Sequence, residues 1–219
     1  FTDGAAESSD PDLILYDVVS IGGVAIDTDT GSVVHFGSMV PKTIVDEWKS
    51  GGIQQVITQA EVYPVLLAKL EFGQDWVGRR VISFIDNDAA RFSLINANSS
   101  SETVADLLMI NCVLDSTYDL SCWYERVASD SNIADGPSRL DFEELINLGS
   151  TFHDIQHPSS IISWRRESLA RHLKEDKGRR ADARTLLWCN QERPVTKRIT
   201  PVLKTYISTV VMKWREGLP

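Results

Sequence analysis

The order in which strand-like and helix-like segments follow one another most constrains the fold of this chain. Residues 20–27 and 32–40 flank a Gly-containing turn, so they predict an antiparallel hairpin. Apolar residues at helical spacing over 53–70 come next. The apolar run 81–85 is typical of a strand buried on both faces, and 120–127 predicts a further strand after more helix. A hairpin followed by alternating helices and strands indicates a mixed sheet with helices packed against it.

Two Ser/Thr-x-x-Glu patterns predict the starts of helices. Thr58-Gln59-Ala60-Glu61 fits a capping box, and residues 99–102 fit a second one. The glutamate of such a box bonds back to backbone N–H groups, so Glu61 is either a helix cap or a residue that is free to bind a ligand. Asp88 leaves a similar choice, because it could cap the next helix while Asp86 ends the strand before it.

The charge is divided unevenly along the chain. The formal net charge of −9 argues against a nucleic-acid partner, because phosphate is neutralised by Lys and Arg. Residues 1–163, however, hold 8 Lys+Arg and 25 Asp+Glu, a net of −17, and residues 164–219 hold 14 and 6, a net of +8. The basic part is therefore the candidate for direct contact with nucleic acid.

Features of a membrane or secreted protein are not visible in the sequence. No apolar run approaches the roughly 18 to 20 residues that span a bilayer, and no signal peptide is recognisable. Cys112, Cys122 and Cys189 are too few and too scattered for a disulfide framework or a zinc cluster. We therefore expect an intracellular protein, cytoplasmic or nuclear, without membrane association. The start at Phe1, without an initiator Met, indicates a piece of something longer.

Four carboxylates stand at predicted strand ends and helix starts. Asp3 is expected to end the first strand, and Asp86 to end the buried strand. Glu61 and Asp135 are each expected to open a helix. Such positions gather at the edge of an α/β sheet where ligands bind. Carboxylates brought together there repel one another unless a cation lies among them, and Mg²⁺ is the natural occupant of an oxygen-only site that also receives phosphate.

Four motifs in this order resemble those of ribonuclease H domains. Phe1-Thr2-Asp3-Gly4-Ala5 resembles their first catalytic strand, and Gln59-Ala60-Glu61 their first catalytic helix. Phe84-Ile85-Asp86-Asn87 is similar to their third catalytic element. The segment 131–139 is the most specific match, because its residues 132–139 resemble the end of ribonuclease H domains in retrotransposon reverse transcriptases. The resemblance covers about residues 1–140.

The resemblance implies an α/β fold with one five-stranded mixed sheet, its first three strands antiparallel, and helices on both faces. It also implies cleavage of the RNA strand of an RNA–DNA hybrid with two Mg²⁺ or Mn²⁺ ions, beside an upstream reverse transcriptase polymerase domain. By position, Asp3 would bridge both ions, and Glu61 and Asp86 would support the ion at the leaving group. Asp135 would hold the ion that positions the attacking water, and Arg139 would make a local salt bridge or contact phosphate.

A second interpretation is a catalytically inactive module of the same fold that binds nucleic acid. Arg91 is the only basic residue between positions 89 and 120, and residues 128–134 contain no His that could assist product release. A 3′–5′ exonuclease of the related fold fits less well. Such an enzyme needs Asp-x-Glu on the first strand, whereas Gly4 and Ala5 follow Asp3 here.

The remainder of the chain is expected to form a separate part. We predict a ribonuclease H-like domain over 1–140 and a basic helical extension of unknown role over 141–219, with helices at 161–173 and 201–214. His153 and His157 have the spacing of a helical zinc site. Pro158 follows at once and the general-base Glu is replaced by Asp, so two polar residues near a loop are the simpler interpretation.

Overall fold

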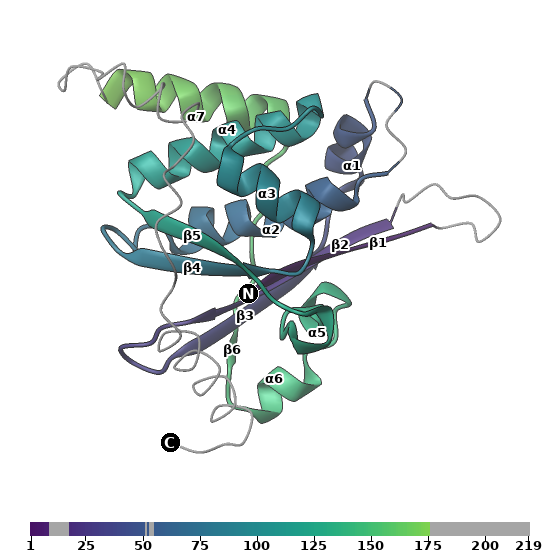
Figure 1. Cartoon of the computed structure of the whole chain (residues 1–219), viewed down its shortest axis with the longest axis vertical. Helices are drawn as coiled ribbons and strands as arrows, with labels where there is room; N and C mark the ends of the chain where they lie inside the picture. The colour runs from purple at the N-terminus through teal and green to yellow at the C-terminus, as the bar shows by residue number, and fades with distance from the viewer. Residues whose placement is uncertain (9–17, 51, 53–54, 176–219) are drawn as a thin grey trace.

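The structure is a computed structural model that describes residues 1–8, 18–50, 52 and 55–175 (Figure 1). Its strands are β1 (Thr2–Glu7), β2 (Val18–Ile26), β3 (Val33–Met39), β4 (Arg80–Ile85), β5 (Ser121–Arg126) and β6 (Thr151–Phe152). Its α-helices are α1 (Lys42–Trp48), α2 (Ile57–Phe72), α3 (Asp88–Asn96), α4 (Glu102–Thr117), α5 (Asp135–Ser138), α6 (Glu143–Asn147) and α7 (Ile161–Glu175). The predicted hairpin, both later strands and the helix at 161–173 are confirmed.

The strands of the described residues form two sheets, so the expectation of a single five-stranded sheet is wrong. One sheet has the order β1-β2-β3-β6, with the first three strands antiparallel and β6 parallel to β3. The other consists of the parallel pair β4 and β5. The two sheets meet where the Phe1 ring stacks on the Phe84 ring, with centroids 4.5 Å apart. β1 and β4 are thus neighbours through side chains and share no hydrogen-bonded ladder.

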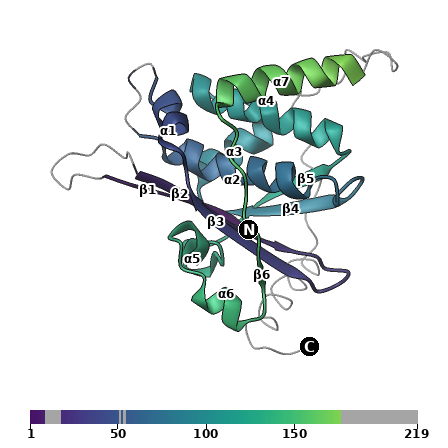
Figure 2. The ribbon, with the colours of Figure 1, turned by 180° about the vertical axis from the view of Figure 1, so that it is seen from behind.

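Helices cover both faces of the larger sheet, as expected. Helices α1, α2, α3, α4 and α7 lie on one side, and the short helices α5 and α6 lie on the other (Figures 1 and 2). The apolar core lies mainly on the α2 side, where Trp48, Tyr63 and Leu107 are fully buried. α2 contacts β1 and β2 directly and also packs against α4, so it is the central helix of this layer.

Two glycines let β1 and β2 lie flush against these helices. A Cβ on Gly4 would come within 2.4 Å of the Ala60 backbone in α2. A Cβ on Gly22 would come within 2.2 Å of the Ser138 backbone nitrogen in α5. Real Cβ atoms do not approach backbone this closely, so both contacts require glycine.

Several predicted boundaries differ from the structure. β1 continues to Glu7, so Asp3 lies inside the strand and not at its end. The reason is that β2 is long enough to pair with β1 as far as Glu7. The capping box at Thr58 does not form, because α2 begins one residue earlier and is capped by no side chain.

The next helix is capped by a different residue from the one proposed. The Asn87 side chain accepts a hydrogen bond from the Ala90 N–H at 3.0 Å and caps α3. Asp88 lies in the first turn, where it pairs with Arg91 and Arg126. Neither aspartate therefore caps α3, and the Asp86 side chain stays available at the end of β4.

Residues 141–175 pack against the part of the chain that precedes them. β6 pairs with β3 at Val34 and His35, and α7 lies along α4 with Trp164 buried in the core. No pattern in the sequence predicts β6, which has two residues, or α6. The division at residue 140 stays a prediction, and the helix predicted at 201–214 lies outside the described residues.

A buried ion pair ties α2 to α4 and β5. The Lys69 side chain is 1% exposed, and its ammonium donates to Asp115 and Asn111 at 2.6 Å and to the Tyr124 hydroxyl at 3.0 Å. Burial by itself disfavours the charged amine. The oxygens of Tyr124 and Asp115 outweigh that effect and raise the pKa of Lys69.

Replacing Asp115 by Asn should destabilise the fold strongly, because a buried ammonium would lose its counter-charge. We expect D115N to lower the free energy of unfolding by about 3 kcal/mol. The exposed pair Lys42–Asp46, with 3.0 Å between Nζ and Oδ1, provides the matched control. We expect D46N to cost about 0.5 kcal/mol or less. Urea unfolding measures both, and equal losses would contradict a stabilising role of the buried pair.

Candidate metal centre

Three of the four predicted carboxylates converge in the structure. Asp3 on β1, Glu61 on α2 and Asp86 directly after β4 each offer an oxygen, and these oxygens all lie within 4.8 Å of one another. Asp3 and Glu61 are buried, 6% and 5% exposed, and Asp86 is half-buried. The three residues come from separate elements and are far apart in sequence, so only the fold brings them together.

The approach of β1 to α2 determines this geometry. Gly4 is in contact with Ala60, and these are the residues next to Asp3 and Glu61. Two carboxylates are therefore placed side by side where strand and helix touch. Asp86 completes the cluster because β4 lies beside β1 at the Phe1–Phe84 stack.

Two buried residues orient the Asp3 carboxylate. The Ser138 hydroxyl donates to Asp3 Oδ2 at 2.5 Å, and the Asn132 side-chain amide donates to Asp3 Oδ1 at 3.4 Å. The same amide also donates to the Thr2 carbonyl at 3.2 Å, so it is fixed to the backbone of β1. No role was predicted for either residue from the sequence. Both lie in the motif 132–139, and the ribonuclease H resemblance of that motif is the sequence signal that could have identified them.

Asp135 lies outside the cluster of three. Its side chain is 50% exposed and pairs with the Arg139 guanidinium, with Nε 3.2 Å from Oδ1. It is nevertheless near enough to contribute to the pKa of Asp3. Its role as a metal ligand stays a prediction, whereas the local salt bridge proposed for Arg139 is present.

The pKa values of the two buried carboxyls are raised. For Asp3 the largest cause is burial, which the Ser138 hydrogen bond opposes and the charges of Asp86 and Asp135 reinforce. Burial, with the charges of Asp3 and Asp86, raises the pKa of Glu61 to about 9. The cluster therefore resists carrying its full negative charge unless a cation compensates for it.

The donor set fits a hard divalent cation. All three residues offer carboxylate oxygens, which Mg²⁺ and Mn²⁺ favour. Glu61 Oε2 is buried and has no hydrogen-bond partner, although buried polar atoms are nearly always paired. A ligand position explains this orphaned atom better than the helix cap does, because the capping box is not formed.

His153 and His157 do not form a metal site. They follow β6 in a segment that is not helical, so the i, i+4 geometry is lost. His153 Nε2 lies 3.3 Å from Glu71, and the His157 ring nitrogens contact Tyr63 and Ser38 at 3.0 and 2.9 Å. Both are satisfied by local polar contacts.

Comparisons with known proteins find similarity only among solved structures. No family model matches the sequence, and a search of curated proteins finds no match. The solved structures that resemble the fold include RNase H1 from the halophilic archaeon Halobacterium salinarum. Its TM-score is 0.48 at 15% sequence identity, over 65% of this chain and 95% of that chain. A likeness at this level leaves the function to be argued from the site itself.

Among the described residues, no helix is long and apolar enough to cross a membrane.

Divalent cations should stabilise the folded chain through this cluster. At an ion concentration about ten times Kd, binding contributes about 1.4 kcal/mol, which corresponds to a rise in Tm of about 3–5 °C. We expect MgCl2 or MnCl2 to produce this rise in the unmodified chain but not in D86N. D88N is the matched control and should keep the rise, because Asp88 pairs with Arg91 and Arg126. Differential scanning calorimetry measures the rise in Tm, and an equal rise in D86N would show that Asp86 is not a ligand of the cation.

The raised pKa of Glu61 should make stability depend on pH. In the folded state the pKa is about 9 against an ordinary value of 4.5, so between these values the folded chain holds a proton that the unfolded chain releases. Stability without divalent cations should therefore fall as pH rises through this window. A tenfold difference between the proton affinities of the folded and unfolded states corresponds to about 1.4 kcal/mol in the free energy of unfolding.

E61Q should flatten this fall, and E144Q, an exposed residue on α6, should leave it unchanged. Urea unfolding at several pH values in EDTA is the measurement. A decline of equal size in E61Q would show that the pH dependence arises elsewhere.

Proposed function

We propose that this chain is a ribonuclease H-type endonuclease that cleaves the RNA strand of RNA–DNA hybrids with two Mg²⁺ or Mn²⁺ ions. One observation carries the proposal, the convergence of Asp3, Glu61 and Asp86 with ligand oxygens within 4.8 Å. These are the positions at which the ribonuclease H resemblance expects catalytic carboxylates.

The roles of the residues follow from their surroundings. When bound, paired divalent ions activate a water and neutralise charge on the departing oxygen of a phosphodiester. Asp3 and Glu61 would hold them from the buried side, and Asp86 from the more open side. Asp135 is half-exposed at the rim and would join as the fourth ligand.

Three residues of the motif 132–139 keep the carboxylates in position. Ser138 and Asn132 bond to both oxygens of Asp3, which restricts rotation of the carboxylate before any substrate arrives. Arg139 bonds to Asp135 and restrains it in the same way. Such preorganisation means that the site does not have to reorganise as charge develops.

The substrate class follows from the resemblance and from the charge distribution. An RNA–DNA hybrid would be distinguished by 2′-hydroxyls in its wide minor groove. We propose that the basic part, residues 164–219, or an upstream reverse transcriptase polymerase domain supplies phosphate contacts. This retroelement setting, with a domain at 1–140, an extension at 141–219 and a cytoplasmic or nuclear location, belongs to the proposal.

An inactive nucleic-acid-binding module is the second candidate. It is favoured by the absence from residues 128–134 of a His that could assist product release. The candidate shares the fold with the nuclease and differs only in whether the phosphodiester is cut.

Cleavage of a labelled RNA–DNA hybrid tests the proposal directly. With MgCl2 or MnCl2 we expect the full chain to cut the RNA strand, and we expect D86N to be slower by more than about 100-fold, because loss of a ligand exceeds the cost of losing a residue that only supports one. Gel analysis of time courses gives the rates.

D88N is the control for this experiment, because it makes the same chemical change two residues away, outside the cluster. Its rate should stay within a few-fold of the unmodified chain. Binding of the hybrid by fluorescence anisotropy, without cutting in either metal, would favour the inactive module. Cutting that persists in D86N would contradict the assignment of this site.

A further inference from the structure

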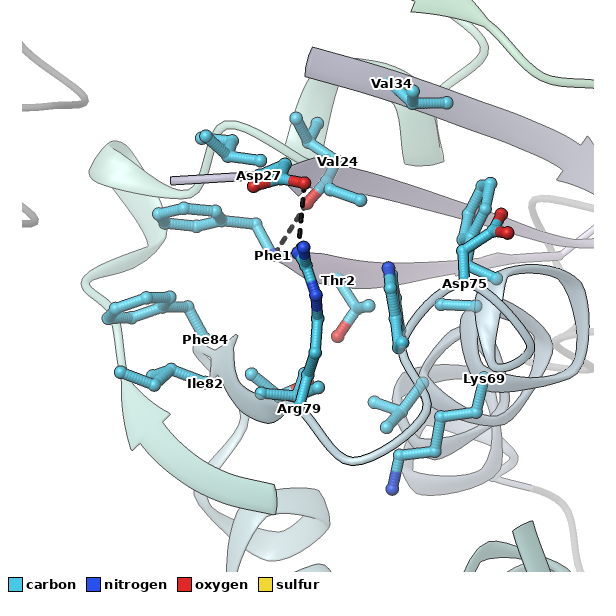
Figure 3. A pocket seen from close by; sticks show the side chains of 18 of the residues that line it. Phe1, Thr2, Val24, Asp27, Val34, Lys69, Asp75, Arg79, Ile82 and Phe84 are labelled. Carbon is cyan, nitrogen blue, oxygen red and sulfur yellow. Dashed lines mark hydrogen bonds and ion pairs between the residues drawn. The ribbon is translucent and has the colours of Figure 1, made fainter. Parts of the chain in front are cut away.

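His35 lies on the face of the larger sheet that α5 and α6 cover. Along β3, Val34 lines the cavity of about 450 Å³ between the two sheets (Figure 3), and Phe36 belongs to the core on the α2 side. Because side chains alternate between the two faces of a strand, the His35 side chain points to the opposite side. The residue is 0% exposed there. The proposed nuclease chemistry gives this buried histidine no role.

Two parts of one segment enclose the His35 ring. Phe142, which precedes α6, and Phe152 of β6 have ring centroids 5.4 and 5.5 Å from that of the imidazole. The two phenyl rings also contact each other edge to face, with centroids 5.3 Å apart. β6 is attached further through the His153 N–H, which donates to the His35 carbonyl at 2.8 Å. We call residues 142–152, which include α6 and β6, the arm.

The hydrogen bonds of Ser150 determine which nitrogen of the neutral His35 ring carries the proton. The Ser150 hydroxyl oxygen lies 2.7 Å from His35 Nδ1 and 2.6 Å from the Leu145 carbonyl oxygen. A carbonyl can only accept, so the single hydroxyl proton is donated to Leu145. The Ser150 oxygen then accepts from Nδ1, and the neutral His35 ring carries its proton there.

The second ring nitrogen of His35 has no partner. Nε2 is buried and makes no hydrogen bond within the described part of the chain. In acid a second proton has to bind at Nε2, which creates a positive charge and an N–H group without an acceptor. Burying such a group is costly, because it loses its hydration and gains nothing in return. Burial accordingly lowers the pKa of His35 from its ordinary value of 6.5.

Among the residues that the structure describes, no charged neighbour offsets this cost. β2, which pairs with β3, contains no titratable residue. The charged or titratable residues in and beside the elements that cover this face are Asp135, Arg139, Asp141, Glu143, Glu144, His153 and Asp154. Asp135 pairs with Arg139, and His153 Nε2 lies 3.3 Å from Glu71. The other four are exposed, and burial is the one cause behind the lowered pKa of His35.

Little apolar surface holds the arm apart from the contact with His35. Leu145 belongs to a cluster of four buried residues that is separate from the main core. Ile146 and Phe152 are 59% and 47% exposed, and β6 has only two residues. Segments with few buried apolar contacts open locally at a lower cost than global unfolding. A modest loss of stability at His35 is therefore enough to release the arm while the α2-side core stays folded.

We propose that His35 is a pH-sensitive latch, which keeps the arm closed on β3 while its imidazole is neutral and releases the arm when the imidazole is protonated. Release frees the edge of β3 at Val34 and His35, where β6 is now paired. The proposal does not depend on the nuclease function, because it concerns only how the arm is attached.

The direction of the pH dependence follows from proton linkage. With the arm open, His35 is hydrated and has its ordinary pKa of 6.5, whereas the closed arm lowers that pKa. The open state therefore binds more protons, so closure is fully favoured above about pH 6.5 and is lost as pH falls below it. The equilibrium constant for opening should rise roughly tenfold between pH 7.5 and pH 5.5.

Hydrogen exchange on the full chain measures this opening. We expect the protection factor of the His153 amide, corrected for the effect of pH on the intrinsic rate, to fall roughly tenfold over this range. The reference is the Val40 amide, which donates to the Val19 carbonyl at 2.8 Å in the same sheet, away from the arm. It should keep its protection. The opposite pH dependence expected from Glu61 acts on the whole chain and therefore on both amides.

Two variants assign the effect to one histidine. H35F removes the titrating nitrogens and keeps an aromatic ring between the two phenylalanines, so the fall at the His153 amide should disappear. H157N is the matched control, because burial lowers the pKa of His157 too. Its ring nitrogens lie 3.0 and 2.9 Å from the hydroxyl oxygens of Tyr63 and Ser38, which can accept from a protonated ring. The fall should persist in H157N.

Three results would overturn the proposal. The first is an equal fall at His153 and Val40, because acid would then destabilise the whole sheet. The second is a fall that H35F retains or that H157N removes. The third decides the question even if H35F does not fold, since it uses the unmodified chain. Nitrogen-15 NMR of the His35 imidazole should show the proton on Nδ1 at pH 7.5 and a titration midpoint below 6.5, and a midpoint at or above that value would contradict the latch.

Discussion

The close packing of β1 between α2 and α5 is the constraint on which the rest of the structure depends. Gly4 lets α2 touch the strand on one side, and Gly22 lets α5 touch the paired strand on the other. These two contacts bring Glu61 to Asp3 and Ser138 to Asp3. A single side-chain carbon at either glycine would separate the layers, and the carboxylate cluster would open with them. Core packing and the candidate site therefore share one set of contacts.

The cluster also places buried charge where the fold would be more stable without it. Asp3 and Glu61 are buried beside a third carboxylate, with raised pKa values as the consequence. Apolar residues at these positions would make a more stable core. Carboxylates at these positions are understandable if they stabilise the fold only when a cation is bound.

Sequence patterns predicted the helices and strands better than their exact ends and the contacts between them. The hairpin, β4, β5 and the positions of Glu61 and Asp86 follow from periodicity and composition, which are local. The capping box at Thr58 was wrong because Val56 already accepts the first helical hydrogen bond of α2, from Ala60. The bonds from Asn132 and Ser138 to Asp3 span more than 100 residues, and the sheets meet through Phe1 and Phe84, so no local pattern contains these contacts.

β6 is short, but its position matters for how copies of the molecule meet. A sheet ending in β3 would present an edge of unpaired backbone groups, and such edges invite pairing with other chains. β6 covers part of that edge, and the chain then crosses to the opposite layer, where α7 lies on α4. Residues 151–175 thus complete a sheet and a helical layer that residues 1–140 begin, so a fragment ending at residue 140 would leave Val34 and His35 of β3 without their partner strand.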